Sequence, residues 1–315
     1  MVAMKIAFTA DSHWDFVTHA EDVVAQMRDM IGAWKAEAVC VGGDICHCDH
    51  RIKQNRAVQS LLKIHRRTYF VLGNHDLWSF GLDRKQQPDE AFAKHMGLYF
   101  KWGIPLETSW KDDTSTVQRH KSAAFVGSIG FPDFMHPGFT KDKAYYDFNG
   151  CTNDINYMKM SLGFLHYTIP LQEAFFKRLG LAAASDARDV VVLTHYCIFD
   201  DQGQVSGDDV AAYFFNHTMG QQVLKTAKEH PEKRFWCLAG HSHEYCAGRL
   251  KMSAENVYSF GLVTDYHHKH IFFFDTDAEM NQGLEAQPVC LKFPAINGGD
   301  LARGRKAASS FLVGL

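Results

Sequence analysis

Five short segments rich in Asp, Asn and His stand out in this chain. Each ends or follows an apolar run that is typical of a β-strand, and each places oxygen or nitrogen ligands for a metal ion just after it. The segments are Asp11-Ser12-His13, Gly42-Gly43-Asp44, Gly73-Asn74-His75-Asp76, Thr194-His195-Tyr196 and Gly240-His241-Ser242-His243. A single Asp or His at a strand end is usually a cap or a surface residue. Five such segments in this order predict two metal ions and an activated water.

The donor atoms of these segments suit a pair of metal ions. Asp11 and His13 are two residues apart, so one extended turn can point both side chains inward. Asp44 follows a Gly pair, where small residues let the backbone approach a crowded centre, and its two oxygens can bridge two cations. No thiolate belongs to the set. The donors therefore favour two divalent ions drawn from Mn, Fe, Zn or Ni.

The elements that must position these donors alternate between strand and helix. Apolar runs predict strands at 5–10, 38–41, 68–72, 123–129, 189–193, 234–239, 257–260 and 271–274. Helical spacing of apolar residues predicts helices at 20–36, 55–65, 170–181 and 220–229. This alternation predicts an α/β fold with a largely parallel sheet covered by helices. Ligands bind beyond the carboxyl ends of strands in such sheets, which is where all five segments fall.

The regular alternation fails from 77 to about 187, where the chain is rich in aromatic residues and interrupted by Gly and Pro. We expect one domain over 1–315, with an insertion at about 77–187 that shapes the substrate pocket. Asn74, His75, Trp78 and His136 are candidate substrate contacts. Phe134 and Tyr146 could line the same pocket, although core packing explains the aromatic residues equally well.

Bulk composition narrows the possible partners. The chain has 315 residues, a net charge of −3 and 46% hydrophobic residues, which is typical of a globular protein and argues against strong nucleic-acid binding. No apolar run approaches the roughly 18 residues of a membrane span. The first residues lead directly into a short predicted strand, so we expect no targeting segment there. Eight Cys in a chain of this length do not indicate a disulfide framework, and Cys40 and Cys237 fall in predicted strands. We therefore expect a cytoplasmic protein, with no prediction for its oligomeric state.

Two further clusters of His carry weaker signals. The run Cys46-His47-Cys48-Asp49-His50 has the composition of a zinc site but lacks a second Cys pair at the usual spacing. The run His267-His268-Lys269-His270 is interpreted as a polar turn before the strand at 271–274, with substrate contact as the alternative.

Taken together, the five segments resemble the signature of the calcineurin-like metallophosphoesterases. That signature reads D-x-H, G-D, G-N-H-D/E, H and G-H-x-H, and its parts match residues 11 to 243 in the same order. The resemblance implies a four-layer α/β/β/α sandwich with two mixed sheets. It also implies one metal bound by Asp11, His13, Asp44 and His243. A second metal would be bound by Asp44, Asn74, His195 and His241.

The resemblance implies hydrolysis of a phosphoester. Two metal ions roughly 3.5–4 Å apart lower the pKa of a bridging water, so that a hydroxide forms near neutral pH and attacks phosphorus. His75 would protonate the leaving oxygen or stabilise the transition state as a catalytic residue. The expected substrate is a phosphomonoester or phosphodiester of a small molecule, with nucleotides included. A nuclease of the same fold and a scaffold that has lost activity are the alternatives.

The chain departs from the signature at one position. Many members continue the second segment as G-D-x-x-D, in which the second Asp orients the catalytic histidine, but here His47 stands at that position. Asp49 lies two residues further on and is the candidate replacement. The form found in protein phosphatases, with Arg after that Asp and Glu after the histidine, is absent, which disfavours a protein Ser/Thr phosphatase.

Overall fold

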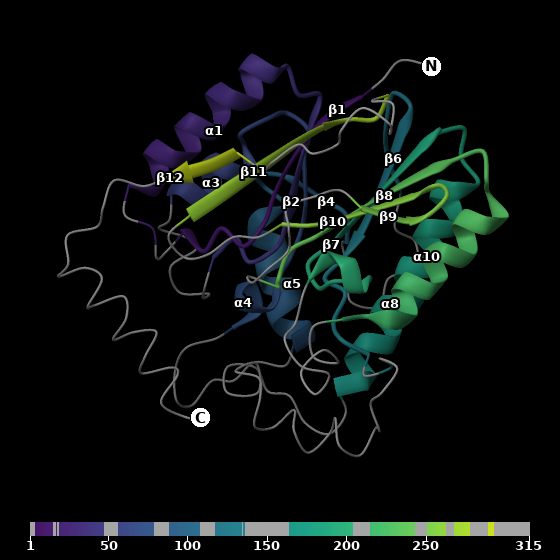
Figure 1. Cartoon of the computed structure of the whole chain (residues 1–315). Coiled ribbons are helices and arrows are strands. Elements are labelled where there is room, and N and C mark those ends of the chain that lie inside the picture. Colours follow the sequence, from purple (N-terminus) through teal and green to yellow (C-terminus); the bar gives the residue numbers. More distant parts are fainter. Residues whose placement is uncertain are drawn as a thin grey trace.

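A computed structural model gives the fold of the chain. It describes residues 4–14, 17, 19–46, 56–78, 88–107, 117–133, 135, 164–203, 215–242, 251–262, 268–277 and 289–292. Two six-stranded sheets are formed, with the strand orders β12-β11-β1-β2-β3-β4 and β5-β6-β7-β8-β10-β9 (Figure 1).

The strands of the two sheets have these bounds. The first sheet holds β1 (Lys5–Thr9), β2 (Ala38–Gly42), β3 (Thr68–Val71), β4 (Ile104–Pro105), β11 (His268–Asp275) and β12 (Val289–Lys292). The second holds β5 (Gln118–His120), β6 (Ala123–Ser128), β7 (Asp189–Thr194), β8 (Arg234–Ala239), β9 (Lys251–Ala254) and β10 (Val257–Gly261). Each sheet contains four parallel strands. In the first sheet these run from β1 to the edge strand β4, and β11 pairs antiparallel with β1 and β12. In the second sheet β6, β7, β8 and β10 are parallel and lie between the antiparallel edge strands β5 and β9, so both sheets are mixed.

Helices cover the outer face of each sheet. They are α1 (Ala20–Trp34), α3 (Arg56–Leu62), α4 (Asn74–Leu77), α5 (Pro88–Tyr99), α8 (Phe164–Ala183) and α10 (His217–Glu229), with a short 3-10 turn η2 (Asp200–Gln202). In Figure 1, α1 and α3 lie on the side of the first sheet, and α8 and α10 lie on the side of the second. No helix in the described part of the chain is both long and apolar enough to cross a membrane.

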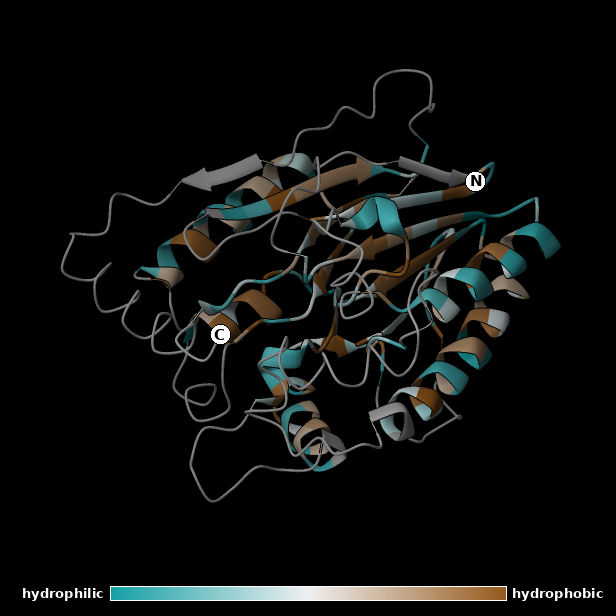
Figure 2. Ribbon diagram, turned by 60° about the horizontal axis from the view of Figure 1, so that its bottom comes forward, coloured by the Kyte–Doolittle hydropathy of each residue, from teal (hydrophilic) through white to brown (hydrophobic). Residues whose placement is uncertain are grey.

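The alternation of side chains along each strand builds the layers. Ile6 and Phe8 of β1 join the core between the two sheets, whereas Ala7 faces the core beneath α1 and α3. In β7, Val191 enters the core between the sheets and Val190 packs beneath α8 and α10. Figure 2 shows the hydrophobic strands enclosed between helices that are hydrophilic on one side. The expected four-layer sandwich is thereby confirmed.

The structure corrects the sequence prediction in three places. A helix, α5, lies inside the stretch 77–187, at a place where the sequence predicted no helix. The helix predicted at 170–181 begins at Phe164, so Pro170 lies inside it, where its missing N–H is outweighed by the buried face that follows. His268, Lys269 and His270 belong to β11 rather than to a turn. Lys269 is 1% exposed, whereas the neighbouring His270 is partly exposed.

Candidate metal centre

The candidate metal centre lies where central strands of both sheets end. The first sheet supplies Asp11 and His13 after β1, Asp44 after β2 and Asn74 after β3. The second supplies His195 after β7 and His241 after β8. All six side chains come from the segments that the sequence singled out.

Unusual backbone conformations gather at this centre. Asp11, His13, Asp44 and His241 have φ values of 50°, 39°, 48° and 69°, in the left-handed region. Asp and His are among the non-glycine residues that tolerate this region best, although it still costs free energy. Strain of this kind persists only where the surrounding structure holds it.

Three glycines sit directly against the donor atoms. A Cβ atom on Gly43 would lie 2.7 Å from the Nδ1 atom of His195, and one on Gly240 would lie 2.6 Å from the Oδ2 atom of Asp11. A Cβ atom on Gly73 would clash with the carboxylate and backbone nitrogen of Asp44. The absence of side chains at these glycines leaves room for the donors to converge.

Hydrogen bonds fasten the loops of the centre to one another. The backbone N–H groups of Asp11 and His13 donate to the carbonyl oxygens of Gly43 and Asp44, at 3.0 and 2.9 Å. From the second sheet, the N–H of His241 donates to both carboxylate oxygens of Asp11, each at 3.0 Å. The donors of the two sheets are therefore held in a fixed relation to each other.

His195 is oriented with its Nε2 atom toward the other donors. Its Nδ1 atom lies 2.9 Å from the carbonyl oxygen of Gly42, which can only accept, so Nδ1 carries the proton. The Nε2 atom lies 2.8 Å from Asn74 Oδ1, 3.1 Å from His241 Nδ1 and 3.4 Å from Asp44 Oδ1. A backbone carbonyl that fixes the tautomer in this way is characteristic of histidines that bind metals. The structure thus brings together all four donors of the second predicted shell.

Asp44 connects this group to a second one. Its Oδ2 atom lies 3.6 Å from His13 Nε2 and 3.9 Å from His75 Nε2, while its Oδ1 atom faces His195. Two groups of donors could therefore hold an ion within the described chain: His13, Asp44 and His75, and Asp11, Asp44 and His195. Asp44 is common to both. The resemblance placed Asp11 with His13 and left His75 outside the ligand shells, whereas this geometry also brings His75 within reach.

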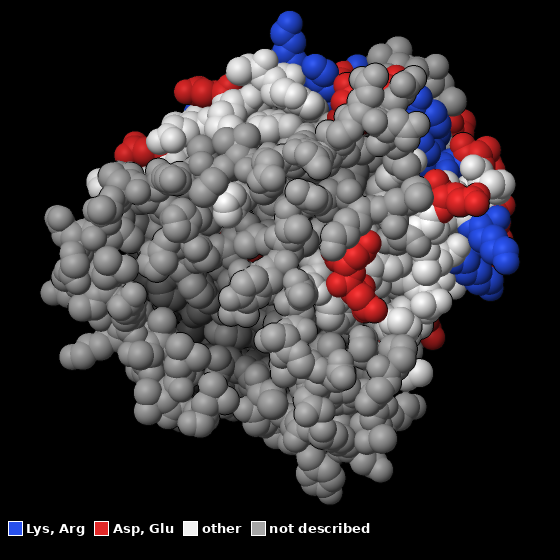
Figure 3. All heavy atoms as spheres, in the orientation of Figure 1, with Lys and Arg blue, Asp and Glu red and all other residues white. Residues whose placement is uncertain are grey.

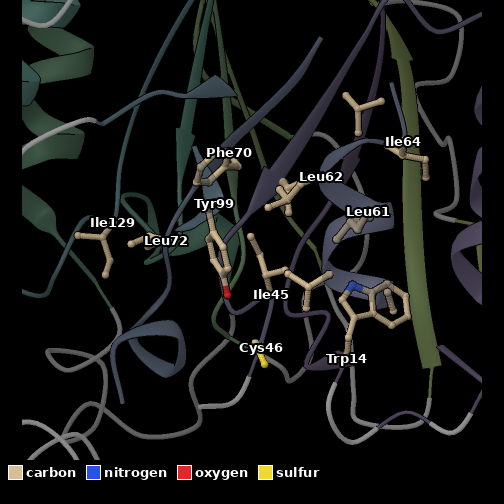
Figure 4. Packing of buried hydrophobic residues seen from close by; sticks show 14 of the residues in the cluster. Trp14, Ile45, Cys46, Leu61, Leu62, Ile64, Phe70, Leu72, Tyr99 and Ile129 are labelled. Atoms are coloured by element: carbon tan, nitrogen blue, oxygen red, sulfur yellow. The ribbon is translucent and has the colours of Figure 1, made fainter. Parts of the chain in front are cut away.

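A buried carboxylate, Asp76, ties two of the loops together. It accepts hydrogen bonds from the backbone N–H groups of Gly73 (2.9 Å), Ile45 (3.3 Å) and Cys46 (3.0 Å). The Tyr99 hydroxyl donates to it at 3.1 Å, and Figure 4 shows the Tyr99 side chain next to that of Ile45. Burial raises the pKa of Asp76 to about 6, against the lowering effect of these four donors. Asp76 therefore fixes the loop of Asp44 relative to that of Asn74.

Sequence reasoning missed the supporting residues around the donors. Asp76 belonged to a recognised segment but received no role, and Tyr99 lies in the stretch without clear periodicity. Lys269 donates from its Nζ atom to the Asp11 carbonyl oxygen at 3.3 Å, and the Tyr196 ring packs on that of His241 with centroids 3.9 Å apart. The only available signals were the carboxylate in the third segment and the Lys within the run of His.

The other predicted site residues are placed as follows. Trp78 is 4% exposed, and its ring stacks on that of His75. His243, Asp49 and His136 lie outside the described residues, as do His47, Phe134 and Tyr146. Of the possible zinc site at 46–50, only Cys46 is described, and it is buried. The assignments of His243, Asp49 and His136 remain predictions.

Comparisons with known proteins give a family and a fold. A family model described as calcineurin-like phosphoesterase matches residues 4–245. The crystal structure of a phosphopantetheinyl hydrolase from Mycobacterium tuberculosis is similar, with a TM-score of 0.61 and 13% identity over 83% of this chain and 89% of that one. GAP50, described as the anchor in the inner membrane complex of Plasmodium, matches with a TM-score of 0.46 and 11% identity over 94% of this chain and 91% of that one. No curated protein sequence matches.

Proposed function

Because the chain belongs to the calcineurin-like phosphoesterase family, we propose that it is a phosphoesterase with two divalent metal ions, acting on a small phosphomonoester or phosphodiester. The observation that carries the proposal is the position of Asp44. One carboxylate oxygen faces His195 and the other faces His13 and His75, as a residue shared by two ions requires. Nucleotides are within the proposed substrate class.

The donors in this centre fit such ions. They are carboxylate and amide oxygens and imidazole nitrogens, which suit Mn, Fe, Zn or Ni. The Nε2 atom of His195 and the Oδ1 atom of Asn74 both accept and lie 2.8 Å apart, so both would be available to bind the same cation. The two shells implied by the resemblance, the second completed by His241 and the first by His243, remain our assignment of ligands. Ions held there would supply Lewis acidity toward the phosphoryl oxygens and activate a water molecule.

The protein residues supply orientation and a proton. Asp11 and Asp44 bring negative charge that favours cations, and the hydrogen bond from His195 to Gly42 keeps its Nε2 atom pointing inward. His75 has a side chain that is 13% exposed, beside Asp44. In the proposed reaction, its Nε2–H donates the proton to the oxygen of the departing alcohol.

The proposal also covers the substrate pocket, the cellular location and the substrates to be screened. The stretch 77–187 would shape the pocket of a single domain, with His136 as a substrate contact. A cytoplasmic location is supported by Cys40 and Cys237, which are free thiols in the buried core. Because a similar fold belongs to a phosphopantetheinyl hydrolase, esters of phosphopantetheine belong in a substrate screen beside nucleotides.

A nuclease remains the second candidate function, since the same metal chemistry cleaves phosphodiesters of nucleic acid. Nucleic-acid binding needs a basic surface. On the face in Figure 3, Lys and Arg of the described residues lie toward the top and right, interspersed with Asp and Glu. Turnover of single- or double-stranded DNA faster than of small esters would favour the nuclease.

The direct test combines metal analysis with two assays. Purified protein is assayed with p-nitrophenyl phosphate and bis-p-nitrophenyl phosphate, with and without added Mn. We expect turnover of at least one ester and bound divalent metal. His75→Ala should lower kcat while the bound metal persists. Loss of the metal from that variant would instead make His75 a ligand. A wild-type protein with neither metal nor turnover would refute the proposal and favour a scaffold.

A further inference from the structure

The ring of Trp78 lies flat against the ring of His75. The two centroids are 3.6 Å apart and the planes are inclined by 27°. We propose that Trp78 is the positioning residue for His75, taking the orienting role for which the family signature uses a carboxylate. The proposal rests on the function proposed above, in which His75 protonates the leaving oxygen.

Trp78 is itself held firmly. It directly follows the short helix α4, and its backbone N–H donates to the carbonyl oxygen of His75 at 3.2 Å. Its side chain belongs to the large core that also contains Trp14, Phe92 and Leu77, and it is only 4% exposed. A ring packed in this way keeps one rotamer, so the face that it presents to His75 is fixed.

His75 is constrained on several sides at once. Its backbone N–H donates to Asp44 Oδ1 at 2.9 Å, which anchors the main chain to the metal centre. One face of the imidazole is covered by Trp78, and the His13 ring meets it nearly perpendicularly, at 75° and 4.8 Å. Rotation of the imidazole out of this arrangement would lose the stacked contact. The stack therefore holds the plane of the imidazole, and within that plane Nε2 lies 3.9 Å from Asp44 Oδ2 at the centre.

This role differs from the substrate contact expected of Trp78. A side chain that is 4% exposed has little surface to offer a substrate, whereas its large contact with His75 is direct. Aromatic stacking contributes enough to change an orientational equilibrium by roughly threefold to tenfold. A change of that size at a proton donor reduces kcat without weakening substrate binding.

The test compares Trp78→Leu and Trp78→Phe with a matched control, Trp34→Leu. Trp34 is a partly buried tryptophan at the end of α1 whose ring packs on Phe273 and beneath the Lys5 ammonium group, both outside the donor segments. Each protein is assayed with a p-nitrophenyl ester and a phenyl ester of the class that the wild type hydrolyses. Phenol is the poorer leaving group, so its departure depends more on a proton donor. Bound metal is measured in parallel.

We expect Trp78→Leu to lower kcat for the phenyl ester roughly tenfold. The loss for the p-nitrophenyl ester should be smaller, with KM and metal content unchanged. Trp78→Phe keeps an aromatic face and should recover most of the wild-type kcat. If Trp78→Leu does not fold, the comparison of Trp78→Phe with the wild type still tests the inference. In a His75→Ala background, neither substitution at Trp78 should reduce kcat further.

Three kinds of change in the Trp78 variants would overturn the inference, as would no change at all. The first is a raised KM with unchanged kcat, which would indicate a substrate contact. The second is an equal loss of kcat for both esters. The third is a loss of kcat that adds fully to the loss caused by His75→Ala. The two failures are distinguishable. If the wild type hydrolyses neither ester, the proposed function falls and the inference falls with it. If the wild type is active and both Trp78 variants match it, the inference alone is wrong.

Discussion

The hydroxyl of Tyr99 donates a hydrogen bond to the carboxylate of Asp76 at 3.1 Å, although the two residues are 23 positions apart. Tyr99 ends α5, whereas Asp76 lies in α4 and also receives the backbone N–H groups of Gly73, Ile45 and Cys46. Through this contact, a helix within the stretch 77–187 supports the loops that carry Asp44 and Asn74.

Removing that hydroxyl should weaken both the fold and the metal centre. Tyr99→Phe leaves a buried carboxylate with one donor fewer, which should lower the free energy of unfolding by about 1–3 kcal/mol. Loss of a supporting contact should also lower metal affinity by roughly tenfold. Urea unfolding and metal titration measure the two effects. Tyr69→Phe is the control, because Tyr69 is a buried tyrosine that stacks on Phe125 between the sheets. Equal effects of both substitutions on metal affinity would contradict this role for Tyr99.

Adding one methyl group at Gly73 should disturb the metal centre directly. The new Cβ of Gly73→Ala would collide with the carboxylate and backbone nitrogen of Asp44, so this loop must move. We expect a loss of roughly 1–3 kcal/mol in unfolding free energy, together with weakened metal binding. Gly97→Ala is the matched control in α5, where a Cβ meets nothing within 4 Å and should stabilise the protein by about 0.5–1 kcal/mol. Normal metal binding by Gly73→Ala would show that the close approach to Asp44 is unimportant.

Acid should destabilise the protein partly through His65, which lies between α3 and β3. Burial, followed by the positive charges of Arg66 and Arg67, lowers the pKa of His65. In the unfolded chain His65 has its ordinary pKa of about 6.5, so near that pH it binds more protons there than in the folded protein. The free energy of unfolding therefore rises as pH increases toward about 7 and falls as pH drops below about 6.5. His65→Asn should flatten this dependence between about pH 5 and 7. Urea unfolding at several pH values between about 5 and 7 gives the free energy of unfolding of the wild type and of His65→Asn. If that free energy changes with pH equally in the two proteins, His65 is excluded as the cause.

Asp49 provides the competing explanation for the orientation of His75. If its carboxylate replaces the one that the signature expects at position 47, Asp49→Ala should lower kcat for phenyl esters while KM and bound metal stay unchanged. Asp22→Ala, on the exposed face of α1, is the control. Wild-type rates in Asp49→Ala would leave Trp78 as the orienting residue.

The sequence predicted the central strands well because both of their faces are buried, which gives each an uninterrupted apolar run. The same pattern predicted one largely parallel sheet, and the division into two sheets came only from the family resemblance. Val190 and Val191 in β7, for example, belong to different hydrophobic clusters. The donors Asp11, Asp44 and His195 were recognisable because each follows such a strand. The support around them was not, since Tyr99 meets Asp76 and Lys269 meets Asp11 only through tertiary contacts. Similarly, the left-handed backbone of Asp11 and Asp44 depends on hydrogen bonds between loops that no local pattern encodes.

The most direct test of the central claim is the metal content of Asp44→Asn compared with that of the wild type. Because Asp44 faces both groups of donors, we predict about two divalent ions per chain in the wild type. We predict loss of both ions, together with phosphoesterase turnover, in the variant. Asp22→Asn, an exposed residue on α1, should retain metal and turnover. Retention of both ions and of turnover in Asp44→Asn, or turnover that survives when His241→Ala is added to it, would contradict the account.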